Sequence, residues 1–546
     1  MKQFRASGFY PYITLLLWVG VLLLCRSGQQ SLMAHDEGIY ATQARTILQT
    51  GDWITPQWGG GFSFDRTIGI QWLIALSYLV FGVSEDTVRL PSVIAFMASV
   101  CLIYRLGLLL LTPRLAWLAA AIFSVVPISL QYARLGTQDT VLVCVELLGI
   151  WALLEGEHQK KRSLSLLTGA AFGWGFLIKG FMIIPATIAL FPYLMGSHRS
   201  HRHLFNPWLY GGLLLGSLPV LGWLAGAIAQ YGMAPVQELF GKLFHLKQQT
   251  YQGAGPFYYF WNVPINGFPW VLVGLVGGIL AVCNQTYQAL LNQRWLLLIG
   301  FPAALFLELT LFGTKTHYYP LQLMPWFALM AAIAIHHCTA YYLQDRRSLL
   351  LGKISQFLTE FSLLLLLAGF SVLSGWFKLD HPDASKIAVV VLVLAMGWLM
   401  PGVLWGQRSS TNQPTLVNHW IASLLLAPWL ALSLLGLTGL WGNYNPELKT
   451  FLEQPAIAQT LKTQTVHFLV DEAQLSREDR KRYLLLTFYT HNLGQHWDQP
   501  QQLLPESYVW VAPLFPMPPN STVVNTHVNW NLIRTAALGF GGGAGG

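Results

Sequence analysis

Long apolar runs are the feature that most restricts how this 546-residue chain can fold. Runs of about 16 to 22 residues, such as Trp208 to Ile228 and Ile387 to Trp405, recur along the chain, and a helix needs about 20 apolar residues to cross a membrane. Hydrophobic residues make up 54% of the sequence and charged residues only 10%. The sequence therefore predicts a polytopic α-helical membrane protein.

Short basic clusters between the apolar runs predict the topology, because basic loops stay preferentially in the cytoplasm. If 67–83 crossed the membrane, the clusters at 160–162 and 346–353 would fall outside; if it lies along the interface, they fall inside. We therefore predict an interfacial helix at 67–83, a cytoplasmic N-terminus and an extracytoplasmic C-terminus in the plasma (inner) membrane. The predicted crossings number about thirteen, near 10–25, 90–109, 115–131, 140–154, 164–179, 181–196, 208–228, 263–283, 295–312, 319–338, 358–376, 387–405 and 418–440.

The composition changes after the last predicted crossing. "VHFLVDE" and "SYVWVAP" are typical of short strands, and "REDRKRYLLLTFYTHNLG" predicts a helix with Gly494 near its end. We therefore divide the chain into a membrane domain at 1–440, which includes an outer loop at 26–89, and a small soluble α/β domain at 441–538. Residues 539–546 are predicted to form a flexible glycine-rich tail.

The first outer loop places two acids where a helix begins. "EGIYATQARTILQTGDW" has helical spacing of its apolar residues, and a helix dipole stabilises Asp36 and Glu37 at its start. A simpler interpretation is that Asp36 only caps this helix. Charged side chains from other outer loops avoid the bilayer centre, so we expect them to meet Asp36 in a watery cavity near the interface.

Seven stretches resemble the bacterial C-type (GT-C) glycosyltransferases in order and spacing. They are "HDEGIYATQARTILQTGDWITPQW", "FDRTIGIQWLIALSYLVFG", "RLPSVIAF", "ARLGTQDTVLV", "GWGFLIKG", "GPFYYFWNVPINGFPW" and "TKTHYYPLQLMPW". The chain is most similar to the branch of aminoarabinose transferases and protein mannosyltransferases. The resemblance implies a GT-C fold and an inverting transfer of sugar from a polyprenyl-phosphate carrier to a lipid, glycan or protein of the envelope.

The resemblance also implies roles for single residues. Asp36 matches the superfamily's catalytic or sugar-orienting aspartate, and Asp139 matches a second aspartate of the same cavity. Arg66 stands where the family has a phosphate-binding lysine, with Thr67 and Ile68 in place of two prolines. The "TKTHYY" loop would lie over the carrier phosphate with Lys315 and His317. We expect Glu37 and Tyr40 to orient substrate.

A divalent metal is the one cofactor that the resemblance implies. Asp65 replaces the glutamate of the family's metal-binding motif, and His245 falls near its histidine ligand. Oxygen and imidazole ligands suit a divalent ion, but "HLKQQ" departs from the usual surroundings of that histidine. An ordinary hydrogen-bonding role for His245 therefore stays open.

The chemistry of transfer requires a carboxylate and cations on opposite sides of the sugar. One carboxylate helps the acceptor nucleophile, as in inverting glycosidases, and we assign this role to Asp36, with Asp139 binding sugar hydroxyls or sharing it. Cations neutralise the departing phosphate, and Arg66 is favoured because a guanidinium binds phosphate bidentately. Arg134 and Lys179 are further candidates, although each could equally be an interfacial cation.

Two other classes of function stay open from the sequence. A flippase or transporter for a lipid-linked sugar also needs a polar cavity between membrane helices, but the sequence has no internal repeat. A scaffold for envelope assembly would leave the outer carboxylates unexplained. The expected partners are a lipid-linked sugar donor, an envelope acceptor and membrane lipids, and nothing in the charge pattern suggests nucleic acid.

Overall fold

The computed structural model describes residues 8–59, 61–197, 201–248, 254–344, 349–409 and 413–536. The predicted tail at 539–546 lies outside them. Contacts divide the chain into two compact units. The first comprises residues 8–27, Phe64–Ile70 and Arg89–Trp441, and the second comprises Gly28–Ser63, Gln71–Val88 and residues 442–536.

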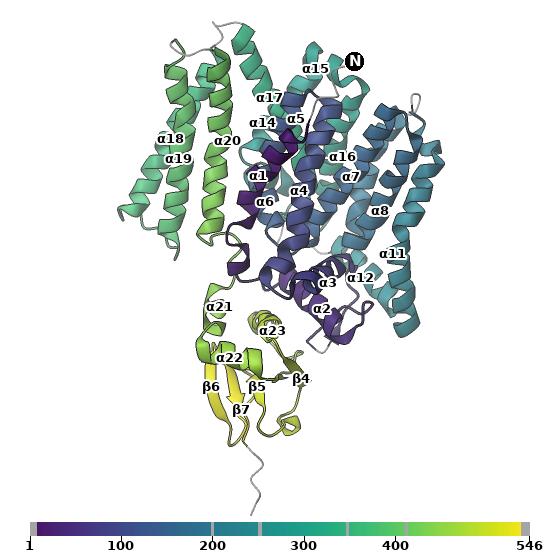
Figure 1. The fold of residues 1–546 in the computed structure, drawn as a ribbon, viewed down its shortest axis with the longest axis vertical. Coiled ribbons are helices and arrows are strands. Elements are labelled where there is room, and N and C mark those ends of the chain that lie inside the picture. The colour runs from purple at the N-terminus through teal and green to yellow at the C-terminus, as the bar shows by residue number, and fades with distance from the viewer. Residues whose placement is uncertain are drawn as a thin grey trace, which may run out of the picture. The chain divides into compact units, whose positions relative to one another are not determined.

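Helices make up the first unit (Figure 1). They are α1 (Tyr10–Leu24), α4 (Glu85–Leu110, whose first turn belongs to the second unit), α5 (Pro113–Ser124), α6 (Pro127–Ala133), α7 (Gln138–Gln159), α8 (Ser165–Lys179), α9 (Ile183–Gly196), α11 (Pro207–Tyr231), α12 (Ala234–Gln248), α13 (Tyr258–Asn266), α14 (Trp270–Cys283), α15 (Gln285–Leu291), α16 (Phe301–Leu311), α17 (Met324–Gln344), α18 (Leu350–Leu373), α19 (Ala384–Gly406) and α20 (Gln413–Leu437). Short turns precede some of them, including η8 (Tyr319–Leu323) before α17.

The helices confirm a polytopic membrane fold but not the predicted number of crossings. Among the described residues, eight helices are long and apolar enough to span a membrane, or up to eleven if each of three bent pairs is one span. The predicted crossings at 164–179 and 181–196 fall in one apolar stretch, Arg162–Gly196. The predicted crossing at 140–154 falls in α7, whose four acidic residues set it apart from an ordinary lipid-facing helix. The count of about thirteen is therefore not confirmed.

Proline explains one of the bent pairs. The predicted crossing at 115–131 is divided between α5 and α6, which meet at 66°. Pro127 is the first residue of α6, and a proline there has no N–H to continue the helix before it. Apolar content alone does not reveal such a break.

Small residues bring α8 and α11 into close contact (Figure 1). A Cβ added to Gly169 would lie 1.9 Å from the carbonyl oxygen of Leu209, and one added to Gly173 would lie 2.3 Å from the carbonyl carbon of Gly216. Close approach of this kind is typical of membrane helices, which associate through small residues. It fixes the position of α8, whose last residue is Lys179.

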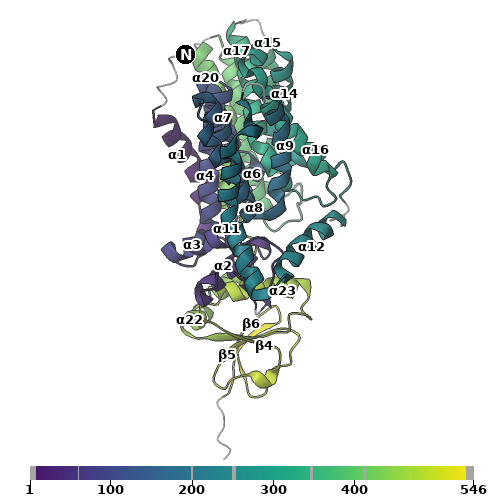
Figure 2. The ribbon, with the colours of Figure 1, turned by 90° about the vertical axis from the view of Figure 1, so that its right-hand side faces the viewer.

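The second unit combines the first loop with the C-terminal segment. It holds α2 (Asp36–Thr50), β1 (Gln57–Trp58), β2 (Gly61–Phe62), most of α3 (Gly69–Phe81), α21 (Pro446–Leu452), α22 (Pro455–Thr463) and α23 (Arg477–Tyr489). A five-stranded sheet has the order β4-β3-β5-β7-β6, with strands β3 (Val466–Leu469), β4 (Leu493–Trp497), β5 (Tyr508–Val511), β6 (Thr522–His527) and β7 (Trp530–Arg534). The C-terminal segment has the strands and helices expected of a small α/β domain, and Figure 2 shows its helices beside the sheet. Its boundary differs from the prediction, because most of the first loop, which we assigned to the membrane domain, belongs to the same compact unit.

One predicted element of this domain ends earlier than expected. The helix predicted up to Gly494 stops at Tyr489, because Thr490 is extended. The following residues, Leu493 to Trp497, form β4 and pair in parallel with β3. The chain after Tyr489 therefore forms hydrogen bonds in the sheet and does not continue the helix. The pairing of β4 with β3 cannot be predicted from the helical pattern of the preceding residues.

The helix predicted along the interface is too short to span. α3 has 13 residues, well below the roughly 20 that a crossing needs. It leaves Leu79, Val80 and Phe81 exposed, with 60%, 71% and 67% of their surface accessible. An exposed apolar face on a short helix suits the predicted interfacial position.

Protonation of His496 is expected to destabilise the sheet as the pH falls. His496 Nδ1 lies 2.6 Å from the Tyr483 hydroxyl, and burial, with a smaller effect of His467, lowers the pKa of His496 to about 4. The unfolded chain titrates near 6.5, so it binds more protons than the folded chain between the two values, and up to about 3 kcal/mol is lost as the pH falls through that range. Burial raises the pKa of Glu472, which offsets part of this loss.

Hydrogen exchange measures this effect in the full-length protein. Protection factors of the β3 and β4 amides should fall between pH 6.5 and pH 4.5, and His496→Gln should remove most of the difference. A parallel loss of protection in both proteins would show that another group is responsible.

Candidate functional site

A buried ion pair joins two of the predicted site residues. Asp139 lies in the first turn of α7 and Lys179 is the last residue of α8. Lys179 Nζ donates to Asp139 Oδ1, and the two side chains are only 12% and 9% exposed. Both charges are stabilised by the dipoles of their helices. An acid and a base in this position are typical of a functional site in a membrane protein.

Aromatic side chains surround Lys179. Its Nζ lies 4.9 Å from the ring centroid of Tyr318 and 5.5 Å from that of Tyr319, which stabilises the cation further. The Tyr132 hydroxyl lies 2.9 Å from His317 Nε2, and the rings of Tyr132 and Tyr318 are 5.3 Å apart. The "TKTHYY" stretch therefore supplies part of the site around Lys179.

His317 acts at this site as a neutral group near pH 7. Burial lowers the pKa of His317, and the charge of Asp139 opposes the change only in part. A neutral imidazole donates from one nitrogen and accepts at the other. His317 therefore suits hydrogen bonding to a substrate better than charge neutralisation.

A second charged cluster forms around Asp65. Lys242 Nζ, from α12, donates to Asp65 Oδ2, and Arg66 Nε lies 3.5 Å from the same oxygen. The main chain beside this cluster is also bound to α12, because Phe64 N donates to Glu238 Oε2 at 2.9 Å. Asp65 is thus paired with two cations, Arg66 and Lys242, and this pairing holds the Arg66 side chain in place.

Packing places this cluster beside Lys179. A Cβ on Gly69 would lie 2.6 Å from the carbonyl oxygen of Leu177, so the chain after Arg66 runs directly against the end of α8. A Cβ added to Gly180, which has a φ of +54°, would lie 3.7 Å from Cγ2 of Thr67. Thr67 and Ile68, which replace the two prolines of the family motif, are thus in the segment that runs against the end of α8.

Buried polar atoms without partners lie on the segments that form this site. Thr67 Oγ1, Gln138 Nε2 and Gln322 Oε1 have no hydrogen-bond partner among the described residues. Gln322 lies in η8, three residues after Tyr319, and its Nε2 donates to Met182 O at 3.3 Å. Because buried polar groups are normally satisfied, these atoms are available to bind water or a polar ligand.

Two predicted phosphate ligands are engaged elsewhere. Arg134 donates to the carbonyl oxygens of Leu22 at 2.8 Å and Cys25 at 2.8 Å, at the end of α1, where helix carbonyls lack partners. Lys315 Nζ donates to Phe312 O at 2.6 Å and is 7% exposed. These contacts favour a structural role for both residues.

Glu146 is a residue of the site that the sequence analysis did not identify. It lies seven residues after Asp139 in α7, hence on the same helix face, and is 6% exposed. Its Oε1 has no hydrogen-bond partner among the described residues, and the charge of Lys179 acts on it. The sequence does contain a signal for Glu146, because an acid in the middle of a predicted membrane crossing is by itself a candidate functional residue.

Replacing Glu146 by glutamine is expected to lower the activity about ten-fold, because the buried carboxyl group on which Lys179 acts is removed. The thermal midpoint in detergent should stay the same or rise, since a buried acid without a full set of partners is costly. Glu155→Gln is the matched control: Glu155 is also buried on α7 but is paired with Arg105 at 3.5 Å. Equal losses of transfer in the two variants would contradict the assignment.

The residues predicted from the first loop belong to the second unit. Asp36 is the first residue of α2, His35 precedes it as the N-cap without a side-chain cap, and His35 Nδ1 lies 3.1 Å from Asp36 Oδ1. Glu37 is fully buried, and its Oε2 accepts from Met33 N at 2.8 Å. Tyr40 is buried as well. Asp36 is therefore the more accessible acid of the two, and Glu37 stabilises the start of the helix.

The predicted metal ligands are Asp65 and His245. The side chain of His245 lies outside the described part of the chain, and the described residues contain no group of three metal-ligating side chains. Asp65 is already paired with Lys242 and Arg66, so these surroundings fit a divalent ion poorly. The metal stays a prediction.

Comparisons with known proteins agree with this architecture. Residues 65–225 match the family described as dolichyl-phosphate-mannose-protein mannosyltransferase. Undecaprenyl phosphate-alpha-4-amino-4-deoxy-L-arabinose arabinosyl transferase 1 of Pseudomonas fluorescens is 29% identical over 73% of this chain and 71% of its own length. The corresponding transferase of Pseudomonas aeruginosa strain PAO1 is 28% identical over 77% and 74%. The crystal structure of ArnT from Cupriavidus metallidurans bound to undecaprenyl phosphate covers 97% of this chain and 98% of that one, with a TM-score of 0.73 and 17% identity.

The chain has the GT-C fold of the ArnT structure, and its sequence is similar to glycosyltransferases that are named for a lipid-phosphate donor. The resemblance predicted from its motifs is thus confirmed. Within this class the chain is similar to the arabinosyl transferases, and these relatives give no support to the alternative of a flippase.

Proposed function

We propose that the protein moves a sugar, with inversion, from a polyprenyl-phosphate carrier to an acceptor of the cell envelope. The observation that carries this proposal is the buried Asp139–Lys179 pair with the Asp65–Arg66–Lys242 cluster packed beside it. Cations that are already held in a membrane-level site suit the binding of a lipid phosphate.

The site residues divide the chemistry between them. The acceptor oxygen attacks the anomeric carbon, the bond from that carbon to the carrier phosphate breaks, and Asp36 takes the acceptor proton. Lys179 and Arg66 neutralise the phosphate as it leaves. When Lys179 turns to the phosphate, Asp139 is released to bind sugar hydroxyls, together with Gln138, Gln322 and Thr67.

The names of the relatives indicate which carrier and sugar to test first. The curated relatives are named for undecaprenyl phosphate and 4-amino-4-deoxy-L-arabinose, so this donor is the first to test. The acceptor is a lipid, a glycan or a protein, and membrane lipids surround the enzyme.

The proposed orientation places the reaction outside the cytoplasm. The N-terminus is cytoplasmic, and the loop with Asp36 and the C-terminal segment are extracytoplasmic, in the plasma (inner) membrane. The basic clusters between the apolar runs support this orientation. Labelling of single cysteines in the first loop and at 160–162 with a membrane-impermeant reagent tests it.

A transfer assay tests the function directly. Purified wild type and the variants Asp36→Asn and Arg66→Ala are given radiolabelled undecaprenyl-phosphate sugars, the aminoarabinose donor first, with envelope extract as acceptor. Transfer by wild type that collapses in both folded variants supports the proposal. Arg66→Lys should keep more activity than Arg66→Ala, because a lysine still supplies a point charge. Carrier translocation in vesicles without transfer from any donor would overturn it in favour of a flippase.

A further inference from the structure

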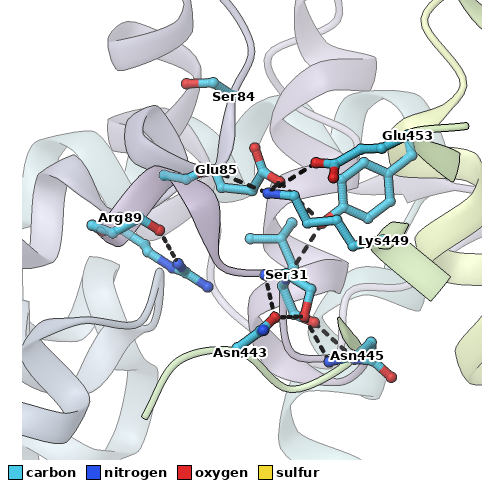
Figure 3. Close-up of polar contacts among 12 residues, drawn as sticks. Ser31, Ser84, Glu85, Arg89, Asn443, Asn445, Lys449 and Glu453 are labelled. Atoms are coloured by element: carbon cyan, nitrogen blue, oxygen red, sulfur yellow. Dashed lines mark hydrogen bonds and ion pairs between the residues drawn. The ribbon is translucent and has the colours of Figure 1, made fainter. Parts of the chain in front are cut away.

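Buried polar contacts join the start of the first loop to the C-terminal segment within the second unit. Lys449 Nζ, from α21, lies 2.6 Å from Glu85 Oε1, and both side chains are only 13% exposed. The Tyr489 hydroxyl donates to the same Glu85 oxygen at 3.2 Å and accepts from Leu32 N at 3.3 Å. We call Glu85, Lys449 and Tyr489 the Lys449 cluster; Figure 3 shows the contacts of Lys449 and Glu85.

Serine and asparagine side chains extend these contacts along the main chain. Ser31 N and Oγ both donate to Asn443 Oδ1, at 3.0 and 2.7 Å. Asn445 N donates to Ser31 Oγ at 2.6 Å, and its Nδ2 donates to Leu32 O at 2.8 Å (Figure 3). The residues just before α2 are therefore bound to the segment that follows the last membrane helix.

Arg45 makes the second connection, from α2 itself. Its Nη1 donates to Phe488 O at 2.6 Å and to Thr487 O at 3.3 Å, and its Nη2 donates to His491 O. These carbonyls lie at the end of α23, where helix carbonyls lack partners. Arg45 is 6% exposed, and its planar fork matches the several acceptors in a way that a lysine does not.

The faces of α2 and α23 also fit closely. A Cβ on Gly38 would lie 3.1 Å from Leu484 Cδ2, so α23 packs against the first turns of α2. Asp36 lies two residues before this contact and nine residues, or about 14 Å of helix, before Arg45. The C-terminal segment therefore contacts α2 near the acid as well as further along.

We propose that Arg45 and Lys449 are positioning residues, through which the C-terminal segment holds α2 so that Asp36 meets the sugar in the reactive geometry. The C-terminal segment is thus part of the catalytic machinery and not a separate module. This inference rests on the proposed function, because Asp36 is the group being positioned. Neither residue touches substrate.

Charge reversal in the full-length protein tests this role. Glu85→Lys and Lys449→Glu, each alone, should lower kcat about ten-fold or more, since small misplacements of a reacting group are costly. Binding of sugar-free undecaprenyl phosphate should stay within about two-fold, because Lys179 and Arg66 belong to the other unit. The double variant Glu85→Lys/Lys449→Glu restores the opposite charges and should recover most of kcat. Lys481→Glu is the matched control, because Lys481 pairs with Glu478 on the exposed surface.

Hydrogen exchange of the α2 amides gives a readout that does not depend on transfer. The single reversals and Arg45→Lys should raise exchange at 36–50, while the double variant and Lys481→Glu should not. Faster exchange of the α2 amides without any change of kcat would overturn the inference. So would α2 amides that stay protected from exchange in all variants. If wild type transfers no sugar from any donor, the proposed function fails, and the exchange data still show whether the C-terminal segment holds α2.

Discussion

The substitution Asp36→Asn is expected to lower the rate of sugar transfer by about 100- to 10,000-fold, which is the usual contribution of a general base. Asparagine has the size of the carboxylate but cannot take the acceptor proton. Because Asp36 begins α2 and His35 is the N-cap, the loss should come from chemistry and not from a missing cap. Single-turnover transfer measures the rate, and binding of undecaprenyl phosphate should be unchanged.

The neighbouring acid supplies the control for this prediction. Glu37→Gln keeps an oxygen that accepts from Met33 N, the contact that Glu37 Oε2 makes now, so most of the activity should remain. If Glu37→Gln is as inactive as Asp36→Asn, the carboxylates act through the structure of the loop. If Asp36→Asn stays active, the base lies elsewhere, with Asp139 as the first candidate.

Methionine in place of Lys179 is expected to abolish carrier binding and to destabilise the membrane unit by about 3 to 5 kcal/mol, because it leaves a buried carboxylate without its partner. Asp139 is then uncompensated, since the contact with Lys179 Nζ is lost. The double variant Lys179→Met/Asp139→Asn should recover most of the stability but none of the binding. Thermal unfolding in detergent and binding of undecaprenyl phosphate separate the two effects.

Lys242→Met is the comparison for the second prediction. Lys242 is also paired with an aspartate, but Asp65 keeps Arg66 at 3.5 Å and is 37% exposed. The loss of stability should therefore be small. If Lys179→Met still binds the carrier, then Arg66 and Lys242, and not Lys179, bind the carrier phosphate.

The sequence predicted what short motifs and apolar length determine. Asp36 does begin a helix, α3 is short, and the stretches at Asp65 and at Lys179 do pack together. The stretches at Asp65 and Lys179 could be expected to meet, because charged side chains avoid the bilayer centre and gather near the interface. The helical membrane fold follows in the same way from apolar length.

Tertiary contacts decide the features that the sequence could not supply. Arg134 and Lys179 read alike in the sequence, as cations near helix ends, yet Arg134 contacts carbonyls of α1 and Lys179 contacts Asp139. Only the packing of distant helices separates these roles. The end of α23 at Tyr489 likewise depends on a neighbour outside the local pattern, because the residues that follow pair with β3.

The contacts between the first loop and the C-terminal segment also set the order of events during synthesis. The loop that carries Asp36 is made early, while Lys449 and the carbonyls that Arg45 binds are made more than 400 residues later. At the usual speed of translation this interval lasts about 20 to 80 s. For all of that time α2 lacks the groups that hold it. If Asp36 acts as we propose, sugar transfer is expected to begin only after residues 446–491 have left the ribosome.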